Sequence, residues 1–193
     1  MVSLRERNRL SAMQLTQRRA LDLFEERGFD EVTVSEIAED VGMAPSTLYR
    51  HFATKEAIVL WDEHAAPIEE ALVRELSRQP PLAAIRHVAV TEIGGRYDDD
   101  LEFQLRRTKY LYATEQLHAA AVEADYRDRV SLTEALEQVV SPDRRAAAPL
   151  LAGAALLAIE VAFDRWQQCD AERSLGELID ASFDDLAHLA ELA

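Results

Sequence analysis

Cysteine is almost absent from this sequence, and glycine and proline are scarce. The single cysteine, Cys169, excludes an intrachain disulfide and a zinc cluster of the usual kind. An inert thiol is the simplest role for Cys169, with redox sensing as the alternative. Six glycines and six prolines among 193 residues, together with much alanine, leucine, glutamate and arginine, favour an all-α protein.

Targeting and membrane signals are missing as well. The first ten residues, MVSLRERNRL, carry charges but are followed by no apolar segment of the kind found in signal peptides. The longest uncharged, mostly apolar run covers residues 146–159, which is short for a membrane span and normal for a buried helix. We therefore expect a cytoplasmic protein without a membrane partner.

The sequence also lacks the motifs of common enzymes. Its five histidines show no H-E-x-x-H or comparable metal spacing. It contains no G-x-S-x-G elbow and no phosphate-cradling glycine loop. Acid pairs such as Asp98 and Asp100 stand where helix N-termini favour negative charge anyway. We expect no catalytic residues, no metal and no cofactor.

The most informative stretch covers residues 33–55, TVSEIAEDVGMAPSTLYRHFATK. Thr33 stands three residues before Glu36, which is the spacing of a capping box. Apolar residues then follow at the spacing of one helix face: Val34, Ile37, Ala38 and Val41. Gly42 ends this helix because glycine adopts the left-handed conformation without a Cβ penalty, and Pro45 suits the first position of the next. The pattern predicts a helix-turn-helix.

The second of these helices is amphipathic. Leu48 and Phe52 face the first helix, whereas the outward side presents polar and basic side chains. No acid occurs between Gly42 and Lys55, although the chain has 36 acidic residues. Such a donor-rich surface fits a phosphate-lined major groove. Two short core helices with a solvated polar face are the alternative.

The order of these features, GF-x3-TV-x2-IA-x3-G-x2-PSTLYRHF-x-TKE, resembles the DNA-binding module of the tetracycline-repressor (TetR) family of bacterial transcription regulators. The resemblance covers residues 10–64. It implies that the helix of residues 45–52 enters the major groove. The residues it places at the DNA are Thr33, Pro45, Ser46, Thr47, Tyr49, Arg50, His51 and Lys55. One departure is Ala44, where many relatives carry a capping serine.

The net charge of −15 argues against DNA binding only if the charge is taken over the whole chain. Residues 1–64 contain 8 Lys/Arg and 12 Asp/Glu, and the remainder contains 13 and 24. Most of the acidity therefore belongs to the second part of the chain. Screening over ~8 Å at physiological salt hides these distant acids from a phosphate.

We expect an N-terminal three-helix DNA-binding domain, residues 1–62, followed by a larger helical ligand-binding and dimerisation domain, residues 63–193. The first helix is expected at about residues 10–27, with Gln17 interrupting its apolar stripe. Beyond a fourth helix that begins near Lys55, the predicted helices cover about residues 67–77, 82–93, 99–126 with a break near 118, 131–140, 143–169 and 174–192.

The helix after Pro142 is apolar on two opposite sides. One stripe contains Leu150, Ala154, Leu157 and Val161. The other contains Leu156, Ile159, Phe163 and Trp166. A surface helix of a monomer needs only one such stripe, so the second favours a partner. The resemblance implies a homodimer through the last two helices, and a helix buried within its own domain is the alternative.

The resemblance further implies a pocket in the second domain for a small apolar or amphipathic ligand. The candidate lining residues are Trp61, Phe103, Arg107, Tyr110, Phe163 and Trp166. The cluster of Arg106, Arg107 and Lys109 suits an anionic headgroup such as that of an acyl-coenzyme A. A cationic drug and a merely solvated face are the alternatives.

We therefore expect a homodimeric repressor that a ligand releases from a palindromic double-stranded DNA operator. An activator of the same family is one alternative. A protein-binding adaptor that keeps the helix-turn-helix only as a scaffold is another.

Overall fold

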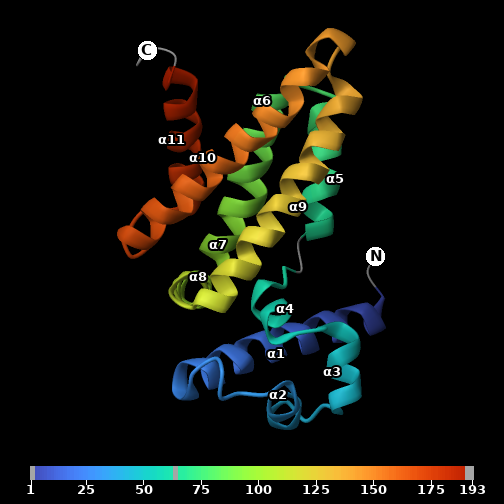
Figure 1. Cartoon of the computed structure of the whole chain (residues 1–193), viewed down its shortest axis with the longest axis vertical. Helices are drawn as coiled ribbons and strands as arrows, with labels where there is room; N and C mark the ends of the chain where they lie inside the picture. The colour runs from blue at the N-terminus through green and yellow to red at the C-terminus, as the bar shows by residue number, and fades with distance from the viewer. Residues whose placement is uncertain (1–2, 63–64, 190–193) are drawn as a thin grey trace. The chain divides into compact units, whose positions relative to one another are not determined.

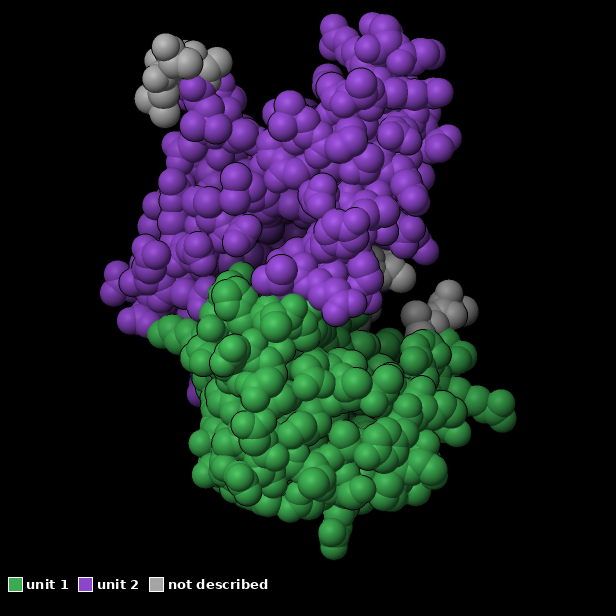
Figure 2. All heavy atoms as spheres, in the orientation of Figure 1, with its two compact units in different colours: residues 1–63, 106–121 green, residues 64–105, 122–193 purple. Residues whose placement is uncertain are grey.

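The computed structural model describes residues 3–62 and 65–189 of the chain (Figure 1). All regular secondary structure in these residues is helical, which confirms the predicted fold class. The chain forms two compact units (Figure 2). The first consists of residues 1–63 and 106–121, and the second of residues 64–105 and 122–193.

The first unit contains α1 (Leu4–Arg27), α2 (Val34–Asp40), α3 (Pro45–His51) and α4 (Lys55–Leu60). It also includes parts of α8 (Leu101–Ala113) and α9 (Glu115–Val139). Helix α1 packs against α2 and α4, and α2 packs against α3. Helix α1 starts earlier than predicted because the hydroxyl of Ser3 caps it, accepting the backbone N–H of Glu6 at 3.2 Å.

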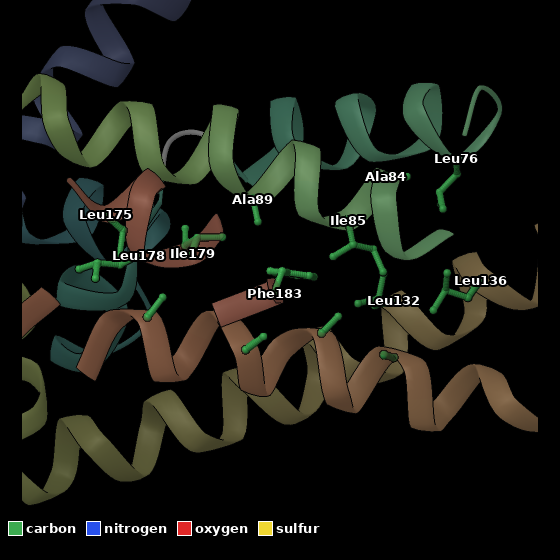
Figure 3. Close-up of a cluster of buried hydrophobic side chains, with 14 of the residues drawn as sticks. Leu76, Ala84, Ile85, Ala89, Leu132, Leu136, Leu175, Leu178, Ile179 and Phe183 are labelled. Carbon is green, nitrogen blue, oxygen red and sulfur yellow. The ribbon is translucent and has the colours of Figure 1, made fainter. Parts of the chain in front are cut away.

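The second unit contains α5 (Ala65–Leu76), α6 (Pro81–Val88), the π-helical turn η1 (Ala89–Gly94) and α7 (Gly95–Asp99). After its portions of α8 and α9 follow the 3₁₀ turn η2 (Pro142–Ala147), α10 (Ala148–Gln168) and α11 (Leu175–His188). Its core joins leucines and Phe183 to a row of small residues on α10 (Figure 3). Helix α11 packs along both α10 and η1.

The predicted gap between the helices of residues 82–93 and 99–126, which begins at Gly94 and Gly95, is wrong. The helix passes through both residues, as η1 and then α7. A Cβ atom at Gly94 would lie 2.5 Å from the Cα atom of Gly176 in α11. Glycine is therefore present at position 94 because two helices cross closely there, and not because the chain turns.

The predicted boundaries of the helices between residues 99 and 140 are also wrong. The break lies at Thr114, between α8 and α9, and α9 then runs without interruption through the predicted gap at residues 127–130. No glycine or proline occurs within α9. Its charged residues in this region are largely exposed on the helix surface, so they do not end it.

Candidate nucleic-acid interface

Helix α2 begins at the predicted capping box. The Thr33 hydroxyl accepts the backbone N–H of Glu36 at 3.2 Å, and the Glu36 carboxylate accepts the backbone N–H of Thr33 at 2.8 Å. Arg27 donates to the same carboxylate at 2.7 Å. The hydrogen bond from Arg27, followed by those from Thr33, lowers the pKa of Glu36 from 4.5 to about 2. The cap is thus charged and closed, which fixes the start of α2.

The turn between α2 and α3 depends on Gly42. Its φ of +66° lies in the left-handed region, where a side chain would be strained. Pro45 opens α3, and Ala44 before it offers no side-chain cap. Leu48 and Phe52 are 0% and 2% exposed, so α3 is anchored along its inner face, as predicted.

The outer side of α3 carries the polar residues that the sequence singled out. Pro45, Ser46, Tyr49 and Arg50 are exposed, whereas Thr47 and His51 are half-buried. Tyr49 keeps 51% of its surface in contact with solvent.

Arg50 differs from most of the other arginines in the first unit. Arg19, Arg27 and Arg106 each form an ion pair with an acid of the same unit. In residues 3–62 and 65–189, no ion pair or hydrogen bond engages the guanidinium of Arg50. An exposed helix face with no acid and an unpaired guanidinium can donate to phosphates or base edges.

Thr33 and Lys55, which the resemblance places at phosphates, are bonded within the unit. The Thr33 hydroxyl donates to the Glu36 carboxylate at 2.7 Å. The Lys55 ammonium donates to the backbone carbonyl of Phe29 at 2.6 Å and lies 4.5 Å from the centroid of the Phe29 ring. Either side chain has to share or exchange these bonds in order to reach a phosphate.

Gln17 is a residue whose importance the sequence did not reveal. Its side chain is 6% exposed and donates to the backbone carbonyls of Ile58, Val59 and Trp61 at 2.9, 3.1 and 2.8 Å. The available signal was a lone amide within an apolar stripe. A buried amide needs partners, but the spacing of residues along the chain does not say which ones.

Three of the six predicted ligand-lining residues belong to the first unit. The Arg107 guanidinium donates to the carbonyl of Trp61 at 3.2 Å. The Tyr110 hydroxyl donates to the carbonyl of Phe24 at 3.0 Å, and its ring is stacked on that of Phe24 with the centroids 6.3 Å apart. Arg106, from the proposed headgroup cluster, forms ion pairs with Asp22 and Glu25. Its charge is therefore already compensated.

The other three, Phe103, Phe163 and Trp166, belong to the second unit. Phe163 and Trp166 form an aromatic cluster with Tyr97, whose ring centroid lies 5.0 and 5.5 Å from theirs. Trp166 is completely buried, and its indole Nε1 has no hydrogen-bond partner within the described residues. Phe103 is 6% exposed.

Helix α10 exposes the two leucines of one predicted apolar stripe, and most other residues of both stripes are half-buried. Leu150 and Leu157 are 76% and 56% exposed, whereas Trp166 on the opposite stripe is buried. Leu150 also borders a groove of about 800 Å³ that is lined mostly by apolar residues of α6, α9, α10 and α11, among them Leu82 and Leu186. The second unit therefore has an apolar surface that nothing in the described chain covers.

By length and composition, the segment Pro142–Gln168 would also be able to cross a membrane, and 28% of its most apolar stretch is buried. Charged residues stand at both of its ends, including Arg144, Arg145 and Arg165. Residues 3–62 and 65–189 contain no group of three His, Cys, Asp or Glu side chains that is placed to hold a metal ion.

Known proteins share both the sequence pattern and the fold. Residues 18–60 match the pattern of bacterial regulatory proteins of the tetR family, and residues 79–190 match that of the MftR C-terminal domain. The HTH-type transcriptional regulator TcmR of Streptomyces glaucescens is 38% identical over 89 residues. That alignment spans 44% of this chain and 38% of the relative.

Two solved structures have a similar fold. Thermus thermophilus FadR, a TetR-family transcriptional repressor solved with lauroyl-CoA, has a TM-score of 0.54 at 20% identity, over 91% of this chain and 93% of its own. A putative TetR-family regulator from Mesorhizobium loti has a TM-score of 0.54 at 18% identity, over 93% and 96%. At these identities the likeness concerns the fold. The two sequence patterns, of which the second covers more than half of the chain, show that this protein belongs to the TetR family of transcriptional regulators, which are DNA-binding proteins and not enzymes.

Proposed function

We propose that the protein is a homodimeric repressor that binds a palindromic operator and is released from it by a small apolar or amphipathic ligand. Residues 1–62 would bind the DNA, and residues 63–193 would bind the ligand and form the dimer. The observation that carries the proposal is the outer side of α3, where exposed Tyr49 and unpaired Arg50 stand on a surface without acids.

Arg50 is the residue we assign to base recognition, because a guanidinium donates two parallel hydrogen bonds to guanine O6 and N7. Ser46, Thr47 and Tyr49 would lie near base edges, with Pro45 at the start of the same helix. Thr33, His51 and Lys55 would then contact phosphates at its margins. The Thr33 hydroxyl has to exchange its bond to Glu36 in order to donate to a phosphate. The Lys55 ammonium can keep its bond to Phe29 and donate to a phosphate with another of its three N–H groups.

The exposed stripe of α10 supports the dimer. A partner that covers Leu150 and Leu157 would remove their side chains from water, which would stabilise the dimer by about 1.5–3 kcal/mol per side chain. A two-fold dimer presents two recognition helices about one turn of DNA apart, roughly 34–36 Å or a little more, and so reads a palindrome. Because members of this family bind DNA, and because the uncharged apolar run of residues 146–159 is short for a membrane span, we assign the protein to the cytoplasm.

The aromatic cluster of the second unit supports a ligand site there. The indole N–H of Trp166 is buried without a partner, which costs about 1–3 kcal/mol unless something accepts it. A hydrogen-bond acceptor on an otherwise apolar ligand would do so. FadR binds lauroyl-CoA, which is an amphipathic molecule of this general kind.

The proposal is tested by a binding selection from random duplex DNA with the purified protein at physiological salt. We expect an enriched palindrome, and we expect Arg50→Ala to weaken binding to it by about 5- to 150-fold for each half-site, the equivalent of 1–3 kcal/mol per base contact. Arg78→Ala is the matched control, because Arg78 is exposed in the second unit. It removes the same charge and should change the affinity less than twofold.

Three other outcomes would contradict the proposal in part. If no duplex is enriched and Arg50→Ala has no effect, the adaptor interpretation is favoured. Enrichment of a non-repeated half-site would argue against the dimer. Increased transcription from a promoter that carries the selected palindrome would make the protein an activator.

A further inference from the structure

The end of α4 is held by side chains from two other helices. The last carbonyls of a helix have no partner within it, and here the Gln17 amide of α1 bonds those of Ile58, Val59 and Trp61. The carbonyl of Trp61 accepts a second bond, at 3.2 Å, from Arg107 of α8. The same backbone oxygen is thus bonded by α1 and by α8.

The side chain of Trp61 continues this connection towards α3. Its ring meets the ring of Phe52 edge-on, with the centroids 6.0 Å apart and the planes at 82°. Phe52 is 2% exposed and ends α3, since its backbone N–H donates to the carbonyl of Leu48 at 2.8 Å. A displacement of Trp61 therefore acts directly on the residue that ends the helix of Arg50.

Arg107 bonds a different helix from the one that its neighbours Arg106 and Tyr110 in α8 bond. Arg106 pairs with Asp22 and Glu25, and Tyr110 bonds the carbonyl of Phe24. These contacts attach this part of α8 to α1. The bond from Arg107 attaches it to the end of α4 as well, at Trp61.

We infer that Trp61 is the joint through which residues 106–121 set the position of the recognition helix, with Gln17 and Arg107 as its positioning residues. The inference rests on the proposed function, because it requires α3 to bind DNA. Neither Gln17 nor Arg107 has to touch the nucleic acid. Both act by fixing the carbonyl of Trp61, and thereby the ring against which Phe52 packs.

The test compares Arg107→Met with Arg106→Met in the full-length protein. Methionine retains much of the apolar stem of arginine and removes its donors. With the duplex enriched in the selection, we expect Arg107→Met to weaken binding by about 2- to 30-fold, the range for residues that modulate a site without touching its ligand. Arg106→Met loses ion pairs that lie at the partly exposed surface and should remain within twofold of the original protein. Arg107→Lys, which keeps a donor, should recover part of the loss.

Two further measurements separate positioning from a loss of folding and from direct contact. All affinities are measured where circular dichroism shows each variant fully folded, and the active fraction is titrated with excess duplex. The slope of log K against log salt is then compared. A residue that contacts a phosphate contributes about 0.9 to this slope, so an unchanged slope in Arg107→Met is the expected result.

Equal affinities of Arg107→Met and the original protein would overturn the inference while leaving the proposed function intact. So would a slope reduced by about two, since Arg107 of each protomer would then contact a phosphate. If the original protein binds no duplex, the proposed function fails, and the inference fails with it.

Discussion

The helices inside the first unit and those inside the second unit are held in place by different kinds of interaction. In the first unit, polar side chains close the ends of the two short helices α2 and α4: Thr33 and Glu36 at the start of α2, Thr54 at the start of α4 and Gln17 at the end of α4. In the second unit, the long helices α10 and α11 pack through apolar side chains, and η1 approaches α11 closely where Gly94 meets Gly176. Polar caps define the direction of a short helix, whereas small residues allow long helices to approach. The caps of the first unit thus fix where its short helices begin and end, whereas the small residues of the second unit let its helices lie close together.

The largest expected effect concerns the close contact in the second unit. Gly94→Ala would place a methyl group against the backbone of Gly176, which has no flexible side chain that could move aside. We expect the free energy of unfolding to fall by about 3 kcal/mol, as measured by chemical denaturation. At Gly95 an added Cβ meets nothing within 4 Å, so Gly95→Ala should stabilise the helix by about 0.5–1 kcal/mol. Equal losses in the two variants would show that packing at position 94 is not special.

The exposed stripe of α10 provides the second prediction. Leu150→Glu combined with Leu157→Glu should raise the dimer dissociation constant by about 100-fold or more, because an interface would bury two unpaired carboxylates. Sedimentation equilibrium measures this change. Val73 of α5 is 61% exposed, and Val73→Glu is the control that should leave the dimer unchanged. A monomeric original protein would refute the role assigned to this stripe.

A smaller change tests whether caps govern the first unit. Ala44 precedes α3 with extended backbone angles but no side-chain cap. Ala44→Ser should supply the missing acceptor and stabilise the unit by about 1 kcal/mol, visible as a higher denaturation midpoint. Ala53→Ser adds the same hydroxyl outside a capping position and should have little effect. If both variants behave alike, the gain has another cause than capping.

The smallest expected effect is a dependence on pH. The pKa of Glu36 is lowered to about 2 in the folded chain, mainly by the hydrogen bond from Arg27. The stability that Glu36 contributes is therefore complete above its unfolded value of 4.5 and is lost as the pH falls from 4.5 to about 2. Titration followed by carboxyl NMR should show this low pKa, and Arg27→Met should bring it back towards 4.5. A value near 4.5 in the original protein would mean that the cap is open in solution.

Features that depend on neighbouring residues could be predicted from the sequence, whereas features that depend on contacts between distant residues could not. The helix-turn-helix was predictable because its signals are local, such as Thr33 three residues before Glu36, and Gly42 at the turn. The role of Gln17 was not, since its partners lie 41 to 44 residues away. Gly94 was misread as a break because its reason for being glycine is Gly176, in another helix. The break at Thr114 could not be predicted, because no glycine or proline stands near it in the sequence.

The alanine row of α10 has one further consequence. Ala148, Ala152, Ala155, Ala158 and Ala162 are all buried in the core that contains Leu178, Ile179 and Phe183 of α11. Alanine has no side-chain rotamers to lose on burial, so α10 contributes its side of this contact without the entropy cost that larger side chains would carry. The outer face of α10 is then presented by a helix whose inner face is packed against α11. A partner that binds there has to immobilise only the exposed leucines, which makes the surface a preorganised one.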